Sequence, residues 1–303
     1  MIQTFKTSPD NEPLGANWRF PSDHLPVSLR LNFNSQEIGL VSWNVLNEAF
    51  IKYIETNQQG LLGSPITELA NASSGISPRD SLILQILKEL LDLNDIICLQ
   101  ECGKEFVTAL ARLCSFILDK ESREICMITS TETPQKDQGV ILYNKDKLKL
   151  NSHKVIPFST HHSKYMIWAN FELVAASRNS DFTVVNTHVP GDPEVLLKSH
   201  QELAKNLHAI PNDRPFIVCG DMNGDPKLIV DNSIYGTDTA ILSPDYPTHI
   251  TTERQAEIYD YFIVRQTPAS ILEHATPQTA PVISGNLIAL SATQLLDLRD
   301  RRG

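Results

Sequence analysis

Polar or ionisable residues stand at the ends of several apolar runs in this sequence. They are Asn44 after "SW", Glu101 after "IICLQ", His188 in "VVNTH", Asp221 and Asn223 in "VCGDMN", and Asp260 in "IYDYF". A single strand-end Asn or Asp is more often a turn or cap residue, and a single such histidine is usually structural. Strands of one sheet can, however, bring their terminal polar groups together on one rim.

The residue types indicate which chemistry such a rim would perform. Carboxylates and amide oxygens without a thiolate are hard ligands that suit Mg²⁺ or Mn²⁺. Histidines can stabilise negative charge on a phosphate, and an aspartate beside an amide can orient an attacking water. Asp260 is the hardest to explain structurally, because a carboxylate inside an apolar strand needs a partner or a cation.

A Ser-Asp-His tripeptide, residues 22–24, precedes a run in which apolar residues alternate with polar ones over residues 25–33. This period of two is typical of a half-buried strand. A second apolar run over residues 38–45 follows a polar break, so we expect a hairpin. With Phe33 opposite Ile38, Val27 would face Asn44. Asp23 and His24 would then share a rim with Asn44.

The rest of the chain alternates between strand and helix patterns. Ser77 and Pro78 start a helix with one apolar face, and further helices are expected over residues 105–118 and 195–208. Strands are expected over residues 95–101, 140–144, 166–173, 182–189, 215–223 and 257–264. No linker divides the chain. We expect one α/β catalytic domain over 1–303, with an extension (1–20), a motif-bearing core (21–264) and a C-terminal strand and helix (265–303), and two packed sheets.

Composition sets limits on partners and location. The net charge of −10 argues against a broad electrostatic grip on duplex nucleic acid, although a local basic cleft stays open. The chain has no apolar run of membrane-spanning length, and its first twenty residues lack a secretory pattern. Five cysteines without metal-type spacing indicate free thiols in a reducing compartment. We expect a cytoplasmic protein, with signal-independent export as the alternative.

Seven segments together resemble the endonuclease/exonuclease/phosphatase superfamily, over residues 21–264. They are "PSDHLPV", "SWNVLN", "DIICLQE", "QGVILYN", "VVNTHV", "CGDMNGDP" and "EIYDYFIV". Local stretches look most like the deadenylase and nocturnin branch. The resemblance implies a four-layer α/β sandwich, in which two mixed β-sheets are flanked by helices.

The order of these segments departs from the family pattern. In that superfamily the Ser-Asp-His motif normally comes last, after the "DYF" strand, whereas here it comes first. The sequence therefore looks circularly permuted. The alternative is that "EIYDYFIV" is a degraded final motif in which Tyr261 replaces the catalytic histidine, which would predict an inactive enzyme. That alternative leaves "PSDHLPVSLRL" unexplained.

The resemblance also implies a role for each rim residue. Glu101 would be the principal metal ligand, helped by Asn44, and Asp221 would orient the attacking water. The substrate phosphate would contact Asn44, Asn223 and His188. His24, held by Asp23, would stabilise the pentacovalent charge, and Asp260 would support that histidine or the second side of the site. The expected cofactor is Mg²⁺, or Mn²⁺.

The function implied is that of a metal-dependent phosphodiesterase, a hydrolase of ester bonds. A nuclease acting on RNA or single-stranded nucleic acid is the first hypothesis. A phosphomonoesterase acting on a nucleotide, inositol phosphate or phospholipid is the alternative, and a catalytically silent phosphate-binding module is a third. The expected partner is the phosphate-ester substrate, and no protein partner can be identified.

Two further groups of residues receive weaker assignments. Lys164 and Tyr165 could reach a substrate phosphate, but a solvated loop is favoured. His161, His162 and His200 lack ligand spacing, so surface histidines are favoured over a metal cluster.

Overall fold

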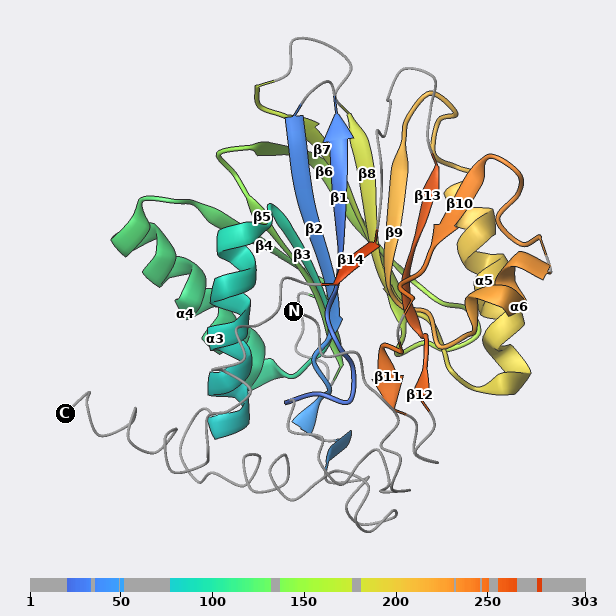
Figure 1. Ribbon diagram of the computed structural model, residues 1–303, viewed down its shortest axis with the longest axis horizontal. Helices are drawn as coiled ribbons and strands as arrows, with labels where there is room; N and C mark the ends of the chain where they lie inside the picture. The colour runs from blue at the N-terminus through green and yellow to red at the C-terminus, as the bar shows by residue number, and fades with distance from the viewer. Residues whose placement is uncertain are drawn as a thin grey trace.

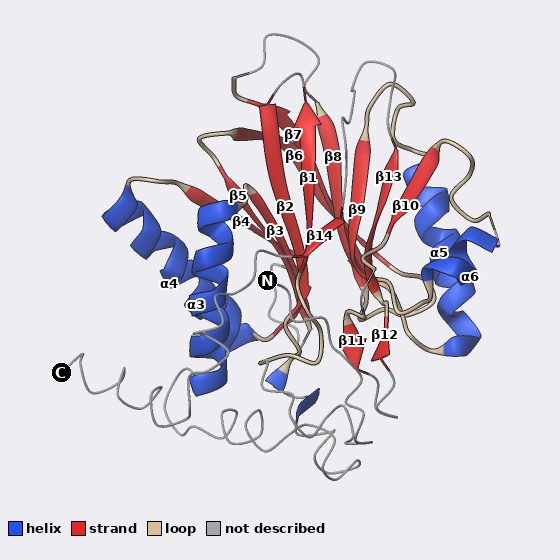
Figure 2. Ribbon diagram, viewed as in Figure 1, coloured by secondary structure: helices blue, strands red, loops and turns tan. Residues whose placement is uncertain are grey.

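Two six-stranded β-sheets pack face to face in the described part of the computed structural model, and helices cover both outer faces (Figure 1). The structure describes residues 21–33, 36–48, 50–51, 77–131, 137–175, 181–231, 233–245, 247–250, 256–265 and 277–279. Figure 2 shows the strands as a central double layer between two helical layers. The predicted four-layer α/β sandwich is confirmed.

The first sheet has the strand order β14-β1-β2-β3-β5-β4. Its strands are β1 (Val27–Phe33), β2 (Gln36–Asn44), β3 (Ile96–Cys102), β4 (Ile125–Thr129), β5 (Gln138–Asn144) and β14 (Pro277–Thr279). β2 and β3 run parallel, and the other neighbours run antiparallel. β14 lies in the C-terminal segment for which the sequence predicts a strand, and the helix predicted there lies outside the described residues.

The second sheet has the order β10-β13-β9-β8-β7-β6. Its strands are β6 (Leu148–Pro157), β7 (Tyr165–Leu173), β8 (Phe182–His188), β9 (Phe216–Asp221), β10 (Thr239–Leu242) and β13 (Asp260–Arg265). β8 and β9 are parallel neighbours. A short ladder of β11 (His249–Ile250) with β12 (Ala256–Glu257) lies beside this sheet.

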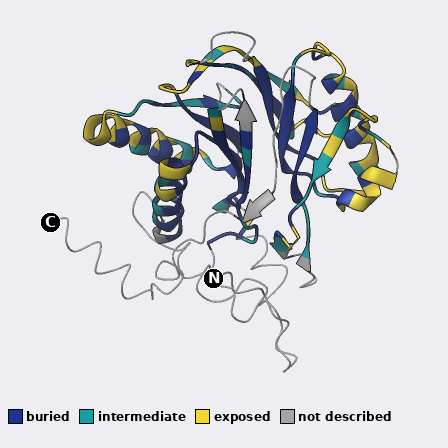
Figure 3. Cartoon of the chain, turned by 45° about the horizontal axis from the view of Figure 1, so that its top comes forward, coloured by how far each residue is buried: buried dark blue, intermediate teal, exposed yellow. Residues whose placement is uncertain are grey.

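Helices α3 (Pro78–Leu93) and α4 (Lys104–Glu121) pack on the first sheet, and α5 (Pro193–Leu207) and α6 (Pro226–Asp231) pack on the second. Ser77 caps α3 by accepting the backbone N–H of Asp80, as the sequence predicts. Three apolar layers result, one between the sheets and one under each helix pair. Figure 3 shows the buried residues along the sheets and the exposed ones on the outer sides of the helices. None of the described helices is long and apolar enough to cross a membrane.

The predicted hairpin forms, but its register differs by two residues. Phe33 pairs with Gln36 rather than Ile38, so Val27 faces Ser42 instead of Asn44. The sequence predicts that Gln36 and Glu37 belong to the connection between the two strands. In the structure both residues pair with β1 as part of β2. An even shift keeps every side chain on its expected face, because the strand period is two.

The run "EIYDYFIV" is two elements rather than one strand. β12 ends at Glu257 and β13 begins at Asp260. The aspartate therefore stands at the start of an apolar strand instead of inside it. This position places its carboxylate at the rim where the neighbouring strand β9 ends, since Asp260 pairs with Asp221.

Candidate active site

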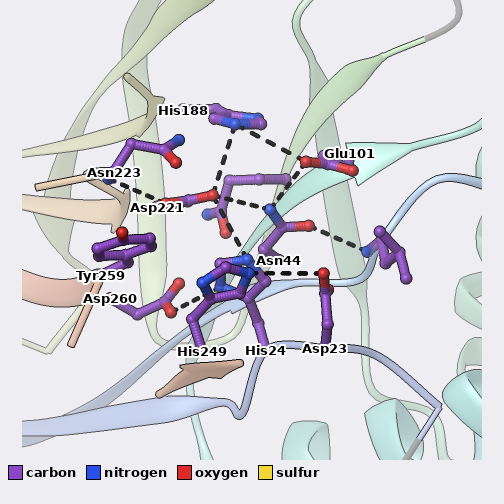
Figure 4. A network of polar contacts seen from close by, with 12 residues as sticks. Asp23, His24, Asn44, Glu101, His188, Asp221, Asn223, His249, Tyr259 and Asp260 are labelled. Atoms are coloured by element: carbon purple, nitrogen blue, oxygen red, sulfur yellow. Dashed lines mark hydrogen bonds and ion pairs between the residues drawn. The ribbon is translucent and has the colours of Figure 1, made fainter. Parts of the chain in front are cut away.

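The sheet registers bring the ends of four strands to one rim. Asn44 at the end of β2 pairs with Gln100, next to Glu101 on the parallel strand β3. In the second sheet His188 and Asp221 pair at the ends of the parallel strands β8 and β9. Because the two sheets pack face to face, these polar groups meet (Figure 4).

Two unusual backbone conformations aim the carboxylates of this rim. Glu101 has a φ of 58°, within an irregular stretch of the β3–β5 ladder. Such a conformation is costly for a residue with a side chain and is found most often at functional sites. Gly220, just before Asp221, has a φ of 145°, and a Cβ there would lie 1.8 Å from the Thr187 carbonyl oxygen. Only glycine fits this position.

Asn44 links the two central carboxylates. Its Nδ2 donates to Oε1 of Glu101 and to Oδ2 of Asp221, each at 3.0 Å, and its Oδ1 accepts the backbone N–H of Leu46 at 3.0 Å. The amide thus presents nitrogen to the carboxylates. The ligand role expected of Asn44 requires its oxygen to face them instead, which needs a turn of the amide.

His24 lies against Asp260 and points toward Asp221. Its Nδ1 is 2.8 Å from Oδ2 of Asp260, and its Nε2 is 3.6 Å from Oδ2 of Asp221. Burial works against the protonated imidazole, but the charges of Asp260 and Asp221 outweigh it and hold the pKa of His24 well above its usual value. His24 is therefore an imidazolium that donates to Asp260 and has one N–H left for a substrate.

Asp260, rather than Asp23, is the carboxylate that contacts His24, which corrects the expected arrangement. Asp23 faces His249, with Oδ2 3.6 Å from Nε2 of that histidine. Burial opposes ionisation of Asp23, but the contact with His249 and the charges of His24 and His249 lower its pKa. Asp23 lies in a bend directly before the His24–His249 bridge, and its carboxylate lies within 4.8 Å of a nitrogen of each imidazole, while Asp260 makes the short contact with His24.

Two hydrogen bonds join the tripeptide to β2, and a third lies within the tripeptide. Ser22 Oγ donates to the Asn44 carbonyl oxygen at 2.7 Å and accepts the His24 backbone N–H at 3.1 Å. Trp43 Nε1 donates to the His24 carbonyl oxygen at 3.1 Å. Buried Arg79 adds to this by donating to the carbonyl oxygens of Pro21 and Leu46. The expected proximity of the tripeptide and Asn44 is therefore present in spite of the register difference.

His188 occupies the opposite side of Asp221. Its Nε2 is 3.5 Å from Oδ2 of Asp221 and 3.7 Å from Oε1 of Glu101. Burial, reinforced by the charge of Lys164, lowers the pKa of His188 well below its usual value. A neutral His188 and a protonated His24 thus flank the same carboxylate. Asn223 closes this side, donating its backbone N–H to Asp221 Oδ1 and its Nδ2 to the Val189 carbonyl oxygen.

Sequence reasoning missed or misplaced several residues of the site. Lys164 is not in a solvated loop, because its side chain is 12% exposed and its Nζ lies 2.7 Å from Oδ2 of Asp137 and 2.9 Å from Nδ1 of His188. Tyr165 is buried in β7. Asp137 precedes β5 and no pattern singled it out. His249 and Tyr259 were also missed, and they lie eleven positions and one position before Asp260, the first residue of β13.

Of the three histidines assigned to the surface, His161 and His162 are exposed but His200 is buried. His200 accepts from the Tyr235 hydroxyl at Nδ1 and donates from Nε2 to the Met222 carbonyl oxygen. Burial lowers its pKa to about 4. His200 thus supports the backbone directly after Asp221. The sequence search looked for metal-ligand spacing among histidines, and a single histidine on the buried face of α5 does not show such spacing.

The donor set fits a divalent cation. Glu101, His188 and Asp221 place one ligand atom each within 4.8 Å of one another, and all three residues are buried. Burial raises the pKa of Glu101 to about 7, with Lys164 opposing and Asp137 and Asp23 reinforcing the shift. Oδ1 of Asp260 and Oδ1 of Asp137 are buried without a hydrogen-bond partner among the described residues. A dication beside Glu101 and Asp221 would compensate this excess of negative charge.

Comparison with known proteins gives a match over most of the chain. The model of the Endonuclease/Exonuclease/phosphatase family matches residues 41–275. Nocturnin of Drosophila melanogaster is 23% identical over 257 residues, covering 80% of this chain and 37% of that protein. The chain therefore spans little more than a third of that relative's length.

Solved structures share the fold at low sequence identity. ANGEL2, described as a 2′,3′-cyclic phosphatase, superposes with a TM-score of 0.55 at 14% identity, covering 82% of this chain and 84% of that one. TDP2 of D. rerio, in complex with a single-stranded DNA product, superposes with a TM-score of 0.52 at 12% identity. The match covers 76% of this chain and 84% of that one. The human Nocturnin catalytic domain with bound sulfate superposes with a TM-score of 0.50 at 20% identity. The match covers 76% of this chain and 82% of that one.

Proposed function

The chain belongs to the endonuclease/exonuclease/phosphatase family, and we propose that it is a divalent-metal-dependent hydrolase of phosphodiester bonds. We propose further that its catalytic histidine comes from the N-terminal end of the domain. The observation that carries this proposal is the 2.8 Å contact between Nδ1 of His24 and Oδ2 of Asp260, with Nε2 of His24 directed at Asp221.

The cation, Mg²⁺ or Mn²⁺, would be held by Glu101 and Asp221, with His188 or a turned Asn44 beside them. When bound, it supplies positive charge to the phosphate oxygens and lowers the pKa of a bound water. Two oxygen donors favour Mg²⁺, and an imidazole among them suits Mn²⁺ better.

Asp221 would orient the attacking water. Burial, reinforced by the charge of Asp260 and offset in part by that of His24, raises the pKa of Asp221. This carboxylate would accept the proton that the water loses. Its Oδ1 is held by the Asn223 backbone N–H, so the oxygen facing the site is fixed.

His24 would donate a hydrogen bond to the phosphoryl group. Its Nδ1–H is taken by Asp260, which leaves Nε2–H for an oxygen that gains charge in the transition state. His188, with its ring neutral, and the nearby Lys164 ammonium offer further donors on the other side. The site can therefore hold a phosphate between two sets of donors while water attacks in line.

Three observations support a circular permutation. The family model matches from Val41 onward, after the tripeptide. β1, which follows the tripeptide, pairs antiparallel with β2, the neighbour that such a rearrangement requires. Tyr261 is fully buried in the apolar layer against α5, so it does not occupy the place of a catalytic histidine. The degraded-motif alternative, which predicts an inactive enzyme, also leaves the contact of His24 with Asp260 unexplained.

RNA or single-stranded nucleic acid is the substrate class we propose. The D. rerio TDP2 structure holds a single-stranded DNA product, and this chain shares its fold. Lys164 provides a cation at the rim despite the net charge of −10. Five free thiols favour a reducing compartment, so a cytoplasmic location is part of the proposal.

The experiment is hydrolysis of a substrate panel with Mg²⁺, with Mn²⁺ and with EDTA. The panel contains bis-p-nitrophenyl phosphate, p-nitrophenyl phosphate, oligo(A), single-stranded DNA and inositol phosphates. We expect cation-dependent cleavage of the diester and of a single-stranded nucleic acid, lost in Glu101→Gln and kept in Glu89→Gln, a change on the exposed side of α3. Cleavage of monoesters alone would favour the phosphatase alternative. Phosphate binding without turnover in every condition would favour the silent module.

A further inference from the structure

Residues 248 and 249 join the Ser-Asp-His segment to the start of β13. The Thr248 carbonyl oxygen accepts the Leu25 backbone N–H at 2.7 Å, and His24 and His249 form an isolated antiparallel bridge. The Thr248 hydroxyl accepts the backbone N–H groups of Tyr259 and Asp260, each at 3.0 Å. The segment thus fixes both ends of the His24–Asp260 contact at once.

Three rings form a stack at this junction (Figure 4). The His24 and His249 centroids are 4.2 Å apart with 31° between their planes. The His249 and Tyr259 centroids are 5.0 Å apart with 24° between their planes. His249 is therefore the middle ring, and one face of the His24 imidazole is covered by it.

Each imidazole of the pair has its own carboxylate. Asp260 holds Nδ1 of His24, whereas Asp23 lies 3.6 Å from Nε2 of His249. The side chains of His249 and Asp23 are 15% and 14% exposed, against 5% for His24. The second pair thus lies outside the first, next to the reacting group without reaching Asp221 itself.

The two sets of contacts restrict different motions of His24. A hydrogen bond at Nδ1 fixes one edge of the ring but permits rotation about that bond. Stacking against a flat neighbour fixes the plane. Both are needed to keep Nε2 directed at the phosphoryl position, and a misplacement of about 1 Å can cost as much as 10²-fold in rate.

We infer that His249 is a positioning residue for His24: held by Asp23, it fixes the plane of the catalytic imidazole by stacking. This inference rests on the proposed function. It also gives the aspartate of the tripeptide a task, which is to act through His249 rather than on its sequence neighbour.

The test compares His249→Phe, which keeps a flat ring, with His249→Leu, which has a similar size and no ring. Nδ1 of His249 is buried without a hydrogen-bond partner among the described residues, so phenylalanine breaks no contact at that atom. Phenylalanine does remove the contact with Asp23, whose side chain is 14% exposed and can be hydrated instead. With bis-p-nitrophenyl phosphate and Mn²⁺, we expect His249→Leu to lower kcat about tenfold with KM within about twofold, and His249→Phe to restore most of it. Asp23→Asn should lower kcat by about threefold, and should have no effect when combined with His249→Phe.

The decisive measurement is the same substitution in a His24→Ala background. If His249 acts through His24, His249→Leu lowers kcat in the wild type and leaves it unchanged in His24→Ala. An equal loss in both backgrounds, wild-type kcat in a folded His249→Leu, or a Phe variant as impaired as the Leu variant would each overturn the inference.

A cooperative thermal unfolding transition shows which variants are folded. If His249→Leu does not fold, His249→Met, which also lacks a ring, replaces it. Lack of turnover in the wild type removes the proposed function and this inference together. Turnover in the wild type with an unaffected Leu variant removes the inference alone.

Discussion

Nδ1 of His24 lies 2.8 Å from Oδ2 of Asp260, although the two residues are 236 positions apart in the chain. His24 precedes the first strand of one sheet, and Asp260 begins a strand of the other. The contact is buried, with side-chain exposures of 5% and 0%. It therefore joins the two sheets at the rim and orients the imidazole in the same interaction.

Asp260→Asn should lower both stability and activity. Removing one charge of a buried ion pair leaves the other without compensation, which costs about 3 kcal/mol. We expect a loss of this size in urea unfolding at neutral pH and a fall in kcat of about 10²-fold, since the imidazole loses its orienting partner. Asp213→Asn, an exposed change, is the control. Wild-type stability in Asp260→Asn would contradict the pairing.

The His24–Asp260 pair should make the free energy of unfolding fall at alkaline pH. The pKa of folded His24 is raised by Asp260 and Asp221 against the opposing effect of burial. The stabilisation is therefore fully present below the unfolded pKa of about 6.5 and is lost as pH rises through the folded pKa. The wild type should lose stability on alkaline titration relative to Asp260→Asn. Parallel stability curves for the two proteins above neutral pH would rule this out.

Metal binding should weaken below neutral pH because of Glu101. Burial raises its pKa to about 7, and a cation must displace the proton that the carboxyl group then carries. The affinity for Mn²⁺, measured by calorimetry, should fall by up to about tenfold per pH unit below the pKa. An affinity that does not change between about pH 5 and about pH 7 would show that Glu101 is not the ligand that titrates.

Glu101→Gln should stabilise the metal-free protein near neutral pH. A carboxyl group whose folded pKa lies above its unfolded value of about 4.5 destabilises the fold as pH rises through that window. A shift to about 7 corresponds to a destabilisation on the order of 3 kcal/mol. Glutamine has no such charge, so the variant should unfold at higher urea concentration while losing Mn²⁺ binding. Lower stability with retained binding would contradict both expectations.

His200 should make the protein sensitive to mild acid. Burial lowers its pKa to about 4, so folding excludes a proton that the unfolded chain binds below about 6.5. Stability from this group is present above pH 6.5 and falls by about 3 kcal/mol as pH drops toward 4. His200→Gln cannot titrate and should show a shallower slope of unfolding free energy against pH. The exposed change His162→Ala should keep the wild-type slope.

The fold and the members of the rim were predictable because they follow from short-range patterns. The alternation after the tripeptide predicts β1, and the Ser77-Pro78 start predicts α3, which begins at Pro78. Strand ends that carry polar groups meet when the strands are parallel neighbours, as His188 and Asp221 do. Such patterns depend on side-chain period and strand direction, both of which a sequence displays.

The partners within the rim were not predictable from the same patterns. The family resemblance implied that Asp23 holds His24 and left Asp260 to support either that histidine or the second side of the site. In the structure Asp260 makes the short contact with His24, and Asp23 lies against His249. Lys164 directly precedes β7 and Asp137 directly precedes β5, so their contact joins the starts of two strands from different sheets. His249 reaches His24 through an isolated bridge of one residue pair, which leaves no periodic signal in the sequence.

The central claim is that one phosphoesterase site is assembled from the N-terminal tripeptide and the "DYF" strand. The most direct test is kcat for bis-p-nitrophenyl phosphate with Mn²⁺ in wild type, His24→Ala and Tyr261→Phe. We expect His24→Ala to lose about 10²-fold or more, as for a lost transition-state donor, and Tyr261→Phe to keep wild-type activity, because Tyr261 is buried in the apolar layer against α5. A near-normal rate in His24→Ala with an inactive Tyr261→Phe would contradict the claim.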